Sequence, residues 1–370
     1  MKCSMLRMKA IQQRLETTGG VLAIVPGNDF RYSLGWSPLP DERLAILWIS
    51  PRRSVLLING VNAEEARTKL SPEIEVLSFD DAEDPVRAAS TLWESLAATL
   101  SNPSVYLSDD ARFDHSQILR SALGPSVAWH LASKVLAPLR MQKDPDEIQA
   151  LMRSQAINDR VMQRAFEAIR PGMAETDLAD FIQRAFSEEG ADRDAFVIVA
   201  FGANAAHPHH TPDSTRLTHG PILLDIGCFK DGYASDMTRM AYYGKPTERY
   251  LEVHEAVERA SQAGMQAVQR RAPVGDVDQA SRNAIQQAGF GPYFVHRTGH
   301  GIGLEVHEPP SVTASNREPM ALGMTFSIEP GIYLPDQFGV RLEDVVVVEE
   351  HRARVLSHLD HRVYLVAEEG

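Results

Sequence analysis

Short apolar runs and amphipathic stretches alternate along the first third of the chain. Each apolar run is rich in strand-forming residues and is bounded by proline, glycine or aspartate, which predicts a β-strand. The stretches between them repeat their apolar positions with the period of a helix. The expected strands are 21–25, 44–50, 54–59, 74–79 and 104–108, and the expected helices are 62–70, 84–100 and 114–123. Strands that alternate with helices predict an α/β domain, which we assign to residues 1–138.

One segment of this domain, residues 28–36, combines aromatic and polar side chains and fits neither pattern. Two interpretations carry equal weight. The segment is a loop that reaches a neighbouring active site, or it is a surface turn on which a tyrosine packs. The charged residues 41–43 that follow are expected to be solvated or to form part of a subunit contact.

Residues 139–370 repeat one order of elements, which is two helices followed by a pair of strands. The first helix begins at Pro145, with Asp144 as its N-cap, and Thr176 is expected to cap the second. The strands of the first copy are 195–200 and 221–229; the second copy has helices 247–270 and 276–288 and strands 325–334 and 339–349. The repeated order predicts two similar halves that pack about a pseudo-twofold axis.

The strand pair of the first half contains two acidic residues. Asp225 lies inside an apolar run, and the turn Asp231-Gly232 is a strong hairpin signal. The return strand, 233–238, contains Asp236. A loop of even length places Asp225 and Asp236 on the same face of the sheet. Two like charges placed in this way would destabilise the hairpin unless a cation lay between them.

The second half repeats this arrangement with Glu329 and Glu343, and Arg341 points to the same face. Buried carboxylates are rare unless they are paired or bound to a cation. Arginines such as Arg239 and Arg341 offer one way to satisfy the four acids. We favour metal binding, because two acidic pairs occur in equivalent places and His300 lies between them in sequence.

His300 belongs to a segment, 296–308, that holds three histidines and three glycines. Neutral imidazole is a common metal ligand. The glycines at 299, 301 and 303 are expected to let the backbone approach a ligand closely. Four carboxylates and one imidazole can hold two divalent ions, and the oxygen-rich set suits Mn²⁺, Co²⁺ or Fe²⁺, with Zn²⁺ also possible.

Composition and charge narrow the range of functions. The net charge of −13 argues against a nucleic acid or an anionic membrane as partner, because both require a basic face. The two cysteines, Cys3 and Cys228, suggest no disulfide framework, and we expect Cys228 to be a core residue. No signal peptide and no apolar stretch long enough to span a bilayer is present in the sequence. These features together predict a cytoplasmic protein.

The order of the five candidate ligands resembles that of the pita-bread metallopeptidases, which include methionine aminopeptidase, aminopeptidase P and prolidase. The resemblance covers residues from about 144 to the end. The first domain resembles the creatinase-type domain of the proline-specific branch, so the expected fold class is α+β with domains 1–138 and 139–370. The matching motifs are Asp225-Ile226-Gly227, Ser235-Asp236-Met237-Thr238-Arg239, Gly299-His300-Gly301-Ile302-Gly303-Leu304, Ile328-Glu329-Pro330-Gly331, Arg341-Leu342-Glu343-Asp344 and, in the first domain, Tyr32-Ser33-Leu34-Gly35-Trp36.

The resemblance implies a role for each residue of the site. Asp236, His300 and Glu329 would contact one metal ion, Asp225 and Asp236 the other, and Glu343 both. Glu329 would also move the proton as general base and then acid. The remaining implied roles are hydrogen-bond donation by His209 and His307, a proline pocket at His296, substrate-carboxylate binding or charge buffering by Arg341, and unassigned solvent-facing positions for His207 and His210.

The implied activity is hydrolysis of the peptide bond before proline by a dinuclear-metal exopeptidase, with Mn²⁺ favoured. The candidate pocket residues for the proline ring are Phe196, Ile198 and Tyr233. We favour an Xaa-Pro dipeptidase acting on short proline-containing peptides, with aminopeptidase P acting on longer peptides as the alternative. A metal-dependent lyase and a binding protein without catalysis are the further alternatives. The resemblance also implies a homodimer, with residues 28–43 as the part contributed across the interface.

Overall fold

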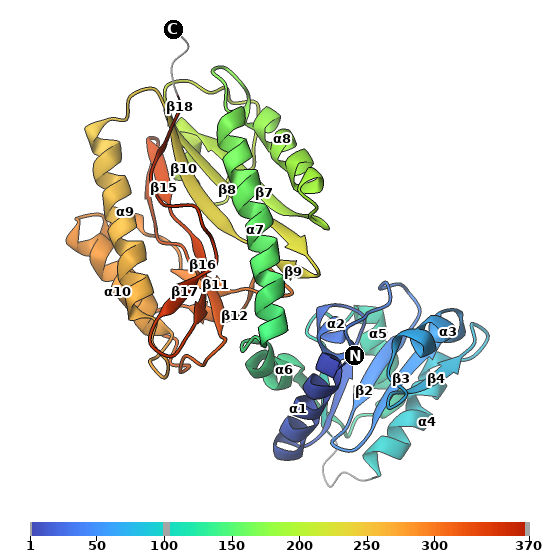
Figure 1. Ribbon diagram of the computed structural model, residues 1–370. Helices are drawn as coiled ribbons and strands as arrows, with labels where there is room; N and C mark the ends of the chain where they lie inside the picture. Colours follow the sequence, from blue (N-terminus) through green and yellow to red (C-terminus); the bar gives the residue numbers. More distant parts are fainter. Residues whose placement is uncertain (1, 99–103, 367–370) are drawn as a thin grey trace. The chain divides into compact units, whose positions relative to one another are not determined.

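The computed structural model of the protein describes residues 2–98 and 104–366. Contacts between residues divide the chain into two compact units, Met1–Arg140 and Met141–Gly370. Figure 1 shows that each unit is built from its own sheets and helices. No helix in the described part of the chain is both long and apolar enough to cross a membrane.

The first unit is a six-stranded sheet in the order β4-β3-β2-β1-β5-β6. Only β2 runs antiparallel to its neighbours; four residues join it to β3, and a longer connection that contains α2 joins it to β1. The strands are β1 (Val21–Ile24), β2 (Ala45–Ile49), β3 (Ser54–Asn59), β4 (Glu75–Phe79), β5 (Ser104–Leu107) and β6 (Ala128–Leu131). The helices are α1 (Lys2–Thr18), α2 (Asn28–Leu34), α3 (Gly60–Lys69), α4 (Pro85–Ala97), α5 (Phe113–Leu123) and α6 (Ser133–Arg140).

The five strands and three helices predicted for this unit are present, and α1, α2, α6 and β6 are additional. The last two residues of the predicted helix 84–100 lie outside the described residues. The core packs the apolar side of α4 and α5 against the sheet, with Trp48 and Trp93 in contact at 6.0 Å between ring centroids. Both tryptophans are buried in the core between the sheet and these helices.

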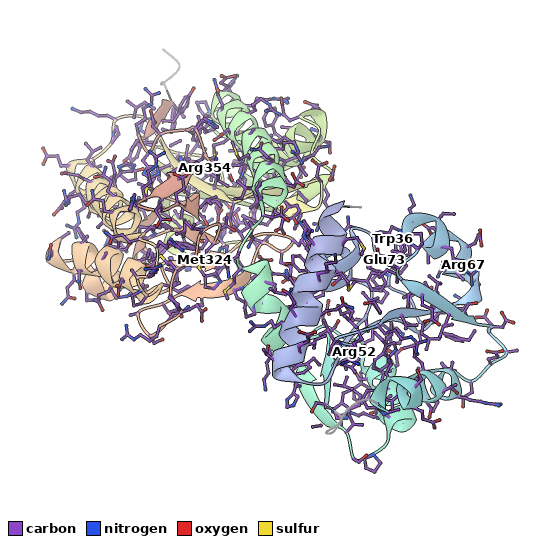
Figure 2. The ribbon with its side chains drawn as sticks, turned by 60° about the horizontal axis from the view of Figure 1, so that its bottom comes forward. Trp36, Arg52, Arg67, Glu73, Met324 and Arg354 are labelled. Carbon is purple, nitrogen blue, oxygen red and sulfur yellow. The ribbon has the colours of Figure 1, made fainter. Side chains whose placement is uncertain are left out.

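Segment 28–36 is not the predicted loop or turn. Residues 28–34 form helix α2, which ends at Gly35 in the left-handed conformation with φ of 74°. Phe30 and Tyr32 are buried in the unit, and Trp36, labelled in Figure 2, meets Phe30 edge-on. Tertiary burial of these aromatic rings outweighs the weak local helix signal of so short a segment.

The second unit consists of two sheets, one hairpin and four long helices. The helices are α7 (Pro145–Ala168), α8 (Glu175–Glu188), α9 (Glu248–Ala267) and α10 (Gly275–Gln287). The first sheet has the order β18-β10-β8-β7, with β9 paired to β8; the second has the order β12-β11-β13-β16-β17; β14 and β15 form the hairpin. The strands are β7 (Arg193–Phe201), β8 (Gly220–Lys230), β9 (Tyr233–Ala234), β10 (Met237–Tyr243), β11 (Gly299–Gly301), β12 (Glu308–Val312), β13 (Thr325–Ile328), β14 (Gly331–Leu334), β15 (Phe338–Arg341), β16 (Asp344–Val348), β17 (Ala353–Val355) and β18 (Tyr364–Val366).

The order of a helix pair followed by a sheet therefore occurs twice, as the sequence predicts. Helices α7 and α8 cover the sheet of the first half, and α9 and α10 lie over the strands of the second (Figure 1). Met324, labelled in Figure 2, belongs to the apolar core shared by α10 and β13. Cys228 is buried in the core of the first half, as expected.

Local capping explains where the first two of these helices start. Asp144 accepts hydrogen bonds from the backbone N–H groups of Asp146 and Glu147, and the Glu147 side chain accepts from the Asp144 N–H. This capping box, with Pro145 after it, confirms the predicted start of α7. The predicted cap of α8 is wrong, because Thr176 already lies inside the helix and Asp177 accepts from the N–H of Ala174 instead.

Candidate metal centre

The nine residues predicted for the site line one cavity of about 600 Å³ in the second unit. They come from both sheets and from the segment after β7, so the two halves of the unit build the cavity together. The lining residues are Ala195, Phe196, Ile198, Pro208, His209, Asp225, Asp236, His296, Arg297, His300, Val306, His307, Glu329, Arg341 and Glu343.

Three of the four acids lie where a strand is interrupted. The sequence predicts continuous strands through Asp236, Glu329 and Glu343, but each residue falls in the gap between two strands. Their backbone N–H groups bond to other segments instead: Asp236 to the Gln155 side chain, Glu329 to the Thr298 carbonyl, and Glu343 to the Thr238 carbonyl. In a regular strand such as β8, successive side chains point to opposite faces of the sheet, and this fixes the direction of Asp225. An interruption of the strand changes the direction of a side chain, so the other three acids do not follow this alternation.

The carboxylates and the imidazole come close together at the base of the cavity. Ligand atoms of Asp236, His300 and Glu343 lie within 4.8 Å of one another. His300 Nε2 is 3.5 Å from Asp236 Oδ2 and 3.3 Å from Glu329 Oε1. All of these side chains are buried or nearly so, and the exposed fraction of Glu329, the most accessible, is 15%. The cluster therefore concentrates negative charge around one neutral nitrogen.

Unpaired oxygens provide a test of whether these residues suit a metal ion. Asp225 Oδ1, Asp236 Oδ1 and Glu343 Oε1 are buried and have no hydrogen-bond partner in the described part of the chain. Buried carboxylate oxygens without partners are costly. Three such oxygens in one cluster, beside an imidazole nitrogen, form a donor set that suits divalent cations. The residues present therefore fit a metal centre.

The electrostatics of the cluster point the same way. Burial, followed by the charge of Asp225, raises the pKa of Asp236 well above its usual value. Burial, with the charge of Asp236 beside it, also raises the pKa of Glu343, and burial raises that of Glu329 to about 7. Buried carboxylates with raised pKa values hold protons because their negative charges repel one another. A bound multivalent cation would offset these charges and favour the ionised form.

His300 is held in the form that binds a metal ion. Its Nδ1 lies 3.1 Å from the carbonyl oxygen of Gly301, so Nδ1 carries the proton and donates it there. Nε2 therefore presents its lone pair to the acidic cluster. Burial, and the neighbouring His307, lower the pKa of His300 to about 3. The imidazole is neutral at physiological pH and available as a ligand.

The glycines around His300 lie in close contact with neighbouring parts of the chain. A Cβ at Gly299 would overlap the carbonyl oxygen of Ser327, and a Cβ at Gly301 would overlap that of Pro309. A side chain at Gly303 would meet the carboxylate of Glu308. The close approach that the structure shows is to β13 and to the segment of β12. Because the three glycines lack side chains, three stretches of backbone pack together around His300.

A chain of hydrogen bonds runs along one wall of the cavity. Arg341 Nη1 donates to the Tyr333 hydroxyl at 2.8 Å, and this hydroxyl donates to His296 Nε2 at 2.8 Å. His296 Nδ1 then donates to the Arg297 carbonyl at 2.7 Å. Burial lowers the pKa of His296 to about 4 and raises that of Tyr333 to about 12. His296 is therefore neutral, and both of its ring nitrogens are engaged within the protein.

Two exposed histidines and two apolar side chains complete the cavity. His209 and His307 are both solvent-accessible, and the His307 ring lies 4.1 Å from that of His300. Phe196 and Ile198, two of the candidate pocket residues, line the cavity. Tyr233 does not, because its hydroxyl donates to Glu147 away from the cavity. His207 and His210 do not line the cavity, and His210 is bonded to Glu175.

Two residues support the ligands: Arg239, which the sequence already offers as a partner for the acids, and Thr238, which sequence reasoning missed. Thr238 donates to Glu343 Oε2 at 2.7 Å and accepts from Arg341 Nε at 3.0 Å. Arg239, almost fully buried, donates to the Glu343 carbonyl and to the Asp344 carboxylate, both at 2.6 Å. Both residues stand in the motif that contains Asp236, two and three positions after this metal-ligand candidate. Their position in that motif could have indicated a supporting role. The partners of their hydrogen bonds could not be predicted in this way, because these partners lie more than a hundred residues away in sequence.

Comparisons with known proteins agree with this geometry. The model of metallopeptidase family M24 matches residues 149–350. A probable dipeptidase PepE from Mycobacterium tuberculosis is 37% identical over 355 residues, covering 93% of this chain and 92% of that protein. An Xaa-Pro dipeptidase from Lactobacillus helveticus is 32% identical, covering 98% of this chain and 99% of that protein. The solved structure of dipeptidase PepE from Mycobacterium ulcerans has a TM-score of 0.92 at 34% identity and covers 99% of both chains.

Proposed function

Because the chain belongs to metallopeptidase family M24, we propose that it is a dinuclear-metal exopeptidase that hydrolyses Xaa-Pro bonds, and specifically an Xaa-Pro dipeptidase. Membership of this family confirms the predicted pita-bread fold class and the predicted metallopeptidase activity. The observation that carries the finer proposal is the cavity in which five candidate ligands meet and three buried carboxylate oxygens have no partner in the described part of the chain. The relatives compared above are named as peptidases, so a lyase is not proposed.

The proposed ligands are Asp225, Asp236, His300, Glu329 and Glu343, with the two ions shared as the family resemblance implies. Bound divalent ions would supply Lewis acidity toward the peptide carbonyl and lower the pKa of a water molecule. Glu329 is the proposed proton carrier, because burial raises its pKa to about 7 and a group of that pKa can accept and return a proton near neutral pH.

The surrounding side chains bind and orient the peptide. His209 and His307 line the cavity and come from segments that are far apart in sequence. Both are available to donate a hydrogen bond to the scissile carbonyl oxygen or to the leaving nitrogen. Phe196 and Ile198 form an apolar surface for the proline ring, whose rigidity suits a shaped pocket. Arg341 is fully engaged with Asp225, Thr238, Pro208 and Tyr333, which favours charge buffering over substrate binding for this residue.

Arg297 supports a dipeptide as the substrate. It lines the cavity and is partly exposed, and within the described residues its side chain donates only to the Ser311 hydroxyl, at 3.4 Å. Among the described residues no acid forms an ion pair with it. A dipeptide brings a terminal carboxylate next to its proline ring, and a guanidinium binds a carboxylate through two parallel hydrogen bonds. A longer peptide has an amide at that position and would leave Arg297 unpaired.

Hydrolysis of an Xaa-Pro dipeptide and of the corresponding Xaa-Pro-Xaa tripeptide, with Mn²⁺ added, tests the proposal. We expect a higher kcat/KM for the dipeptide. Turnover of the tripeptide alone would identify an aminopeptidase P, and turnover of neither would contradict proline-specific peptidase activity. Metal analysis and light scattering on the same preparation test the proposed Mn²⁺ content and the proposed homodimer.

A further inference from the structure

A buried carboxylate outside the metal centre organises the segment that carries His209. Glu175 is the first residue of α8 and is fully buried. Its Oε1 accepts from the backbone N–H of Phe201 at 2.7 Å and from the Asn204 side chain at 3.0 Å. Its Oε2 accepts from His210 Nε2 at 2.7 Å and from the N–H of Asp213 at 3.1 Å. Every donor belongs to one segment, 201–213, which we call the histidine loop.

The position of the charge is favourable. Glu175 lies in the first turn of α8, where the helix dipole stabilises an anion. Backbone bonds tie the same helix start to the far end of the histidine loop, from Glu175 N–H to the Thr215 carbonyl and from Thr176 N–H to the Asp213 carbonyl. The carboxylate therefore joins both ends of the loop to one rigid element.

The opposite side of the histidine loop lies against the metal centre. The Pro208 carbonyl accepts from Arg341 Nη1 at 3.2 Å, and the backbone of Ala205 packs so tightly on β15 that a Cβ at Gly339 would overlap its carbonyl oxygen. His209, the residue after Pro208, lines the cavity. In the described part of the chain, no hydrogen bond holds its own ring. The location of His209 is therefore set by the backbone of the loop.

We propose that Glu175 is a positioning residue that places His209 in the cavity by holding the histidine loop, with His210 as its partner on the loop. This inference rests on the proposed peptidase function, because it assigns His209 to the peptide-binding wall. Glu175 does not touch the cavity. Its effect on hydrolysis must pass through His209 and through the Pro208 carbonyl beside it.

Glu175, His210 and Asp213 also have the spacing of a metal-ligand cluster, with candidate ligand atoms within 4.8 Å of one another. The hydrogen bonds argue against a third metal site. Each oxygen of Glu175 already accepts two hydrogen bonds from the chain. This carboxylate thus differs from Asp225, Asp236 and Glu343, each of which has an oxygen without a partner among the described residues.

A double-mutant cycle tests the positioning role. The variants are Glu175→Gln, His209→Ala and the double variant, each loaded with Mn²⁺ and assayed on an Xaa-Pro dipeptide. In the Glu175→Gln variant an amide NH₂ group replaces one carboxylate oxygen and faces two donors. The histidine loop therefore loses hydrogen bonds that fix it to α8. We expect this change to lower kcat by roughly 10-fold or more with little change in KM, a loss of about one hydrogen bond to a charged group. In the His209→Ala background the same change should cost less than about threefold, because coupled residues are not additive.

Two further variants guard against simple misfolding. His210→Gln keeps a side-chain N–H for Glu175 and should retain activity within about threefold, whereas His210→Ala removes it and should lower kcat severalfold. Asp159→Asn is the matched control, since Asp159 also accepts backbone N–H bonds, from His358 and Leu359, in a segment that does not line the cavity. It should lower stability but leave kcat unchanged.

Three outcomes would overturn the inference. If the losses from Glu175→Gln and His209→Ala multiply, Glu175 does not act through His209. If metal analysis shows that Glu175→Gln loses one equivalent of metal, the cluster is a metal site. Hydrogen exchange tests the anchoring role separately from the proposed peptidase function. Faster exchange of residues 201–213 in Glu175→Gln supports the anchoring role even if no Xaa-Pro peptide is cleaved. Unchanged exchange of these residues contradicts the anchoring role.

Discussion

Arg341 donates a hydrogen bond to Asp225 across the two halves of the second unit, with 2.5 Å between Nη2 and Oδ2. Both side chains are buried, and 116 residues separate them in sequence. The guanidinium pairs with one oxygen of the carboxylate, and the other oxygen has no hydrogen-bond partner among the described residues. Arg341 thus offsets part of the negative charge of the cluster while leaving Asp225 one oxygen for a metal ion.

This arrangement predicts that Arg341 stabilises the metal-free protein more than the metal-loaded one. In Arg341→Gln, four acids lose their nearest cation, so we expect the free energy of unfolding in EDTA to fall by about 3–5 kcal/mol, as when one partner of a buried ion pair is removed. Saturating Mn²⁺ should recover part of this loss. Urea unfolding in both conditions measures the difference, and equal losses would contradict it.

His300 is predicted to be essential for metal retention. We expect His300→Ala to lower the metal content of the purified protein and to reduce kcat on an Xaa-Pro dipeptide by roughly 10³-fold or more, since a catalytic metal supplies several kcal/mol. The measurement is elemental analysis together with steady-state kinetics. Treatment of the unaltered protein with a chelator should have the same effect and should be reversed by Mn²⁺. Full activity and full metal content in His300→Ala would refute the assignment.

Arg297 is predicted to select for the free carboxylate of a dipeptide. Arg297→Gln should lower kcat/KM on an Xaa-Pro dipeptide by roughly 10- to 100-fold, the range expected for lost hydrogen bonds to a charged group. The same peptide with an amidated proline has no charge to recognise and serves as the control. Its hydrolysis should change by less than about threefold. An equal decrease on both substrates would remove Arg297 from substrate selection.

His296 is predicted to make stability depend on pH below neutrality. Burial lowers its pKa from 6.5 to about 4 in the folded protein, so the unfolded chain binds the extra proton first. The free energy of unfolding should therefore fall as pH drops through 6.5, with the loss from this group complete near pH 4 and worth roughly 3 kcal/mol. In His296→Gln this contribution should vanish. Urea unfolding at pH 7 and pH 4 measures it, with exposed His351→Gln as a control that should behave like the unaltered protein.

The sequence predicts best what neighbouring residues decide. The Asp144 capping box and the Asp231-Gly232 turn are local, and the structure contains both; Asp231 and Gly232 have φ values of 53° and 83°. The apolar run around Asp225 likewise predicts that this acid is buried within a strand, and Asp225 lies buried in β8. The cavity then gathers all nine residues that the motif order singles out.

Distant contacts decide the features that the sequence does not predict. The strand interruptions at Glu329 and Glu343 depend on backbone bonds to Thr298 and Thr238, which no local pattern contains. Likewise, the short helix α2 depends on burial of its aromatic rings. The crowding around the glycines beside His300 was also not predicted, because their close neighbours, such as Ser327, lie on another strand.

The division of the site between two halves has a consequence in time. A ribosome that adds roughly 5–20 residues per second delivers Asp225 first and needs roughly 6–24 s to deliver Glu343, 118 positions later in the chain. Until then Asp225 and Asp236 lack both Arg341 and the second acidic pair. A nascent chain that ends before Glu343 therefore lacks part of the candidate site, and the nine predicted residues that line the cavity are complete only once β15 and Glu343 have been synthesised. The order of synthesis thus delays the onset of peptidase activity until synthesis of the chain is nearly finished.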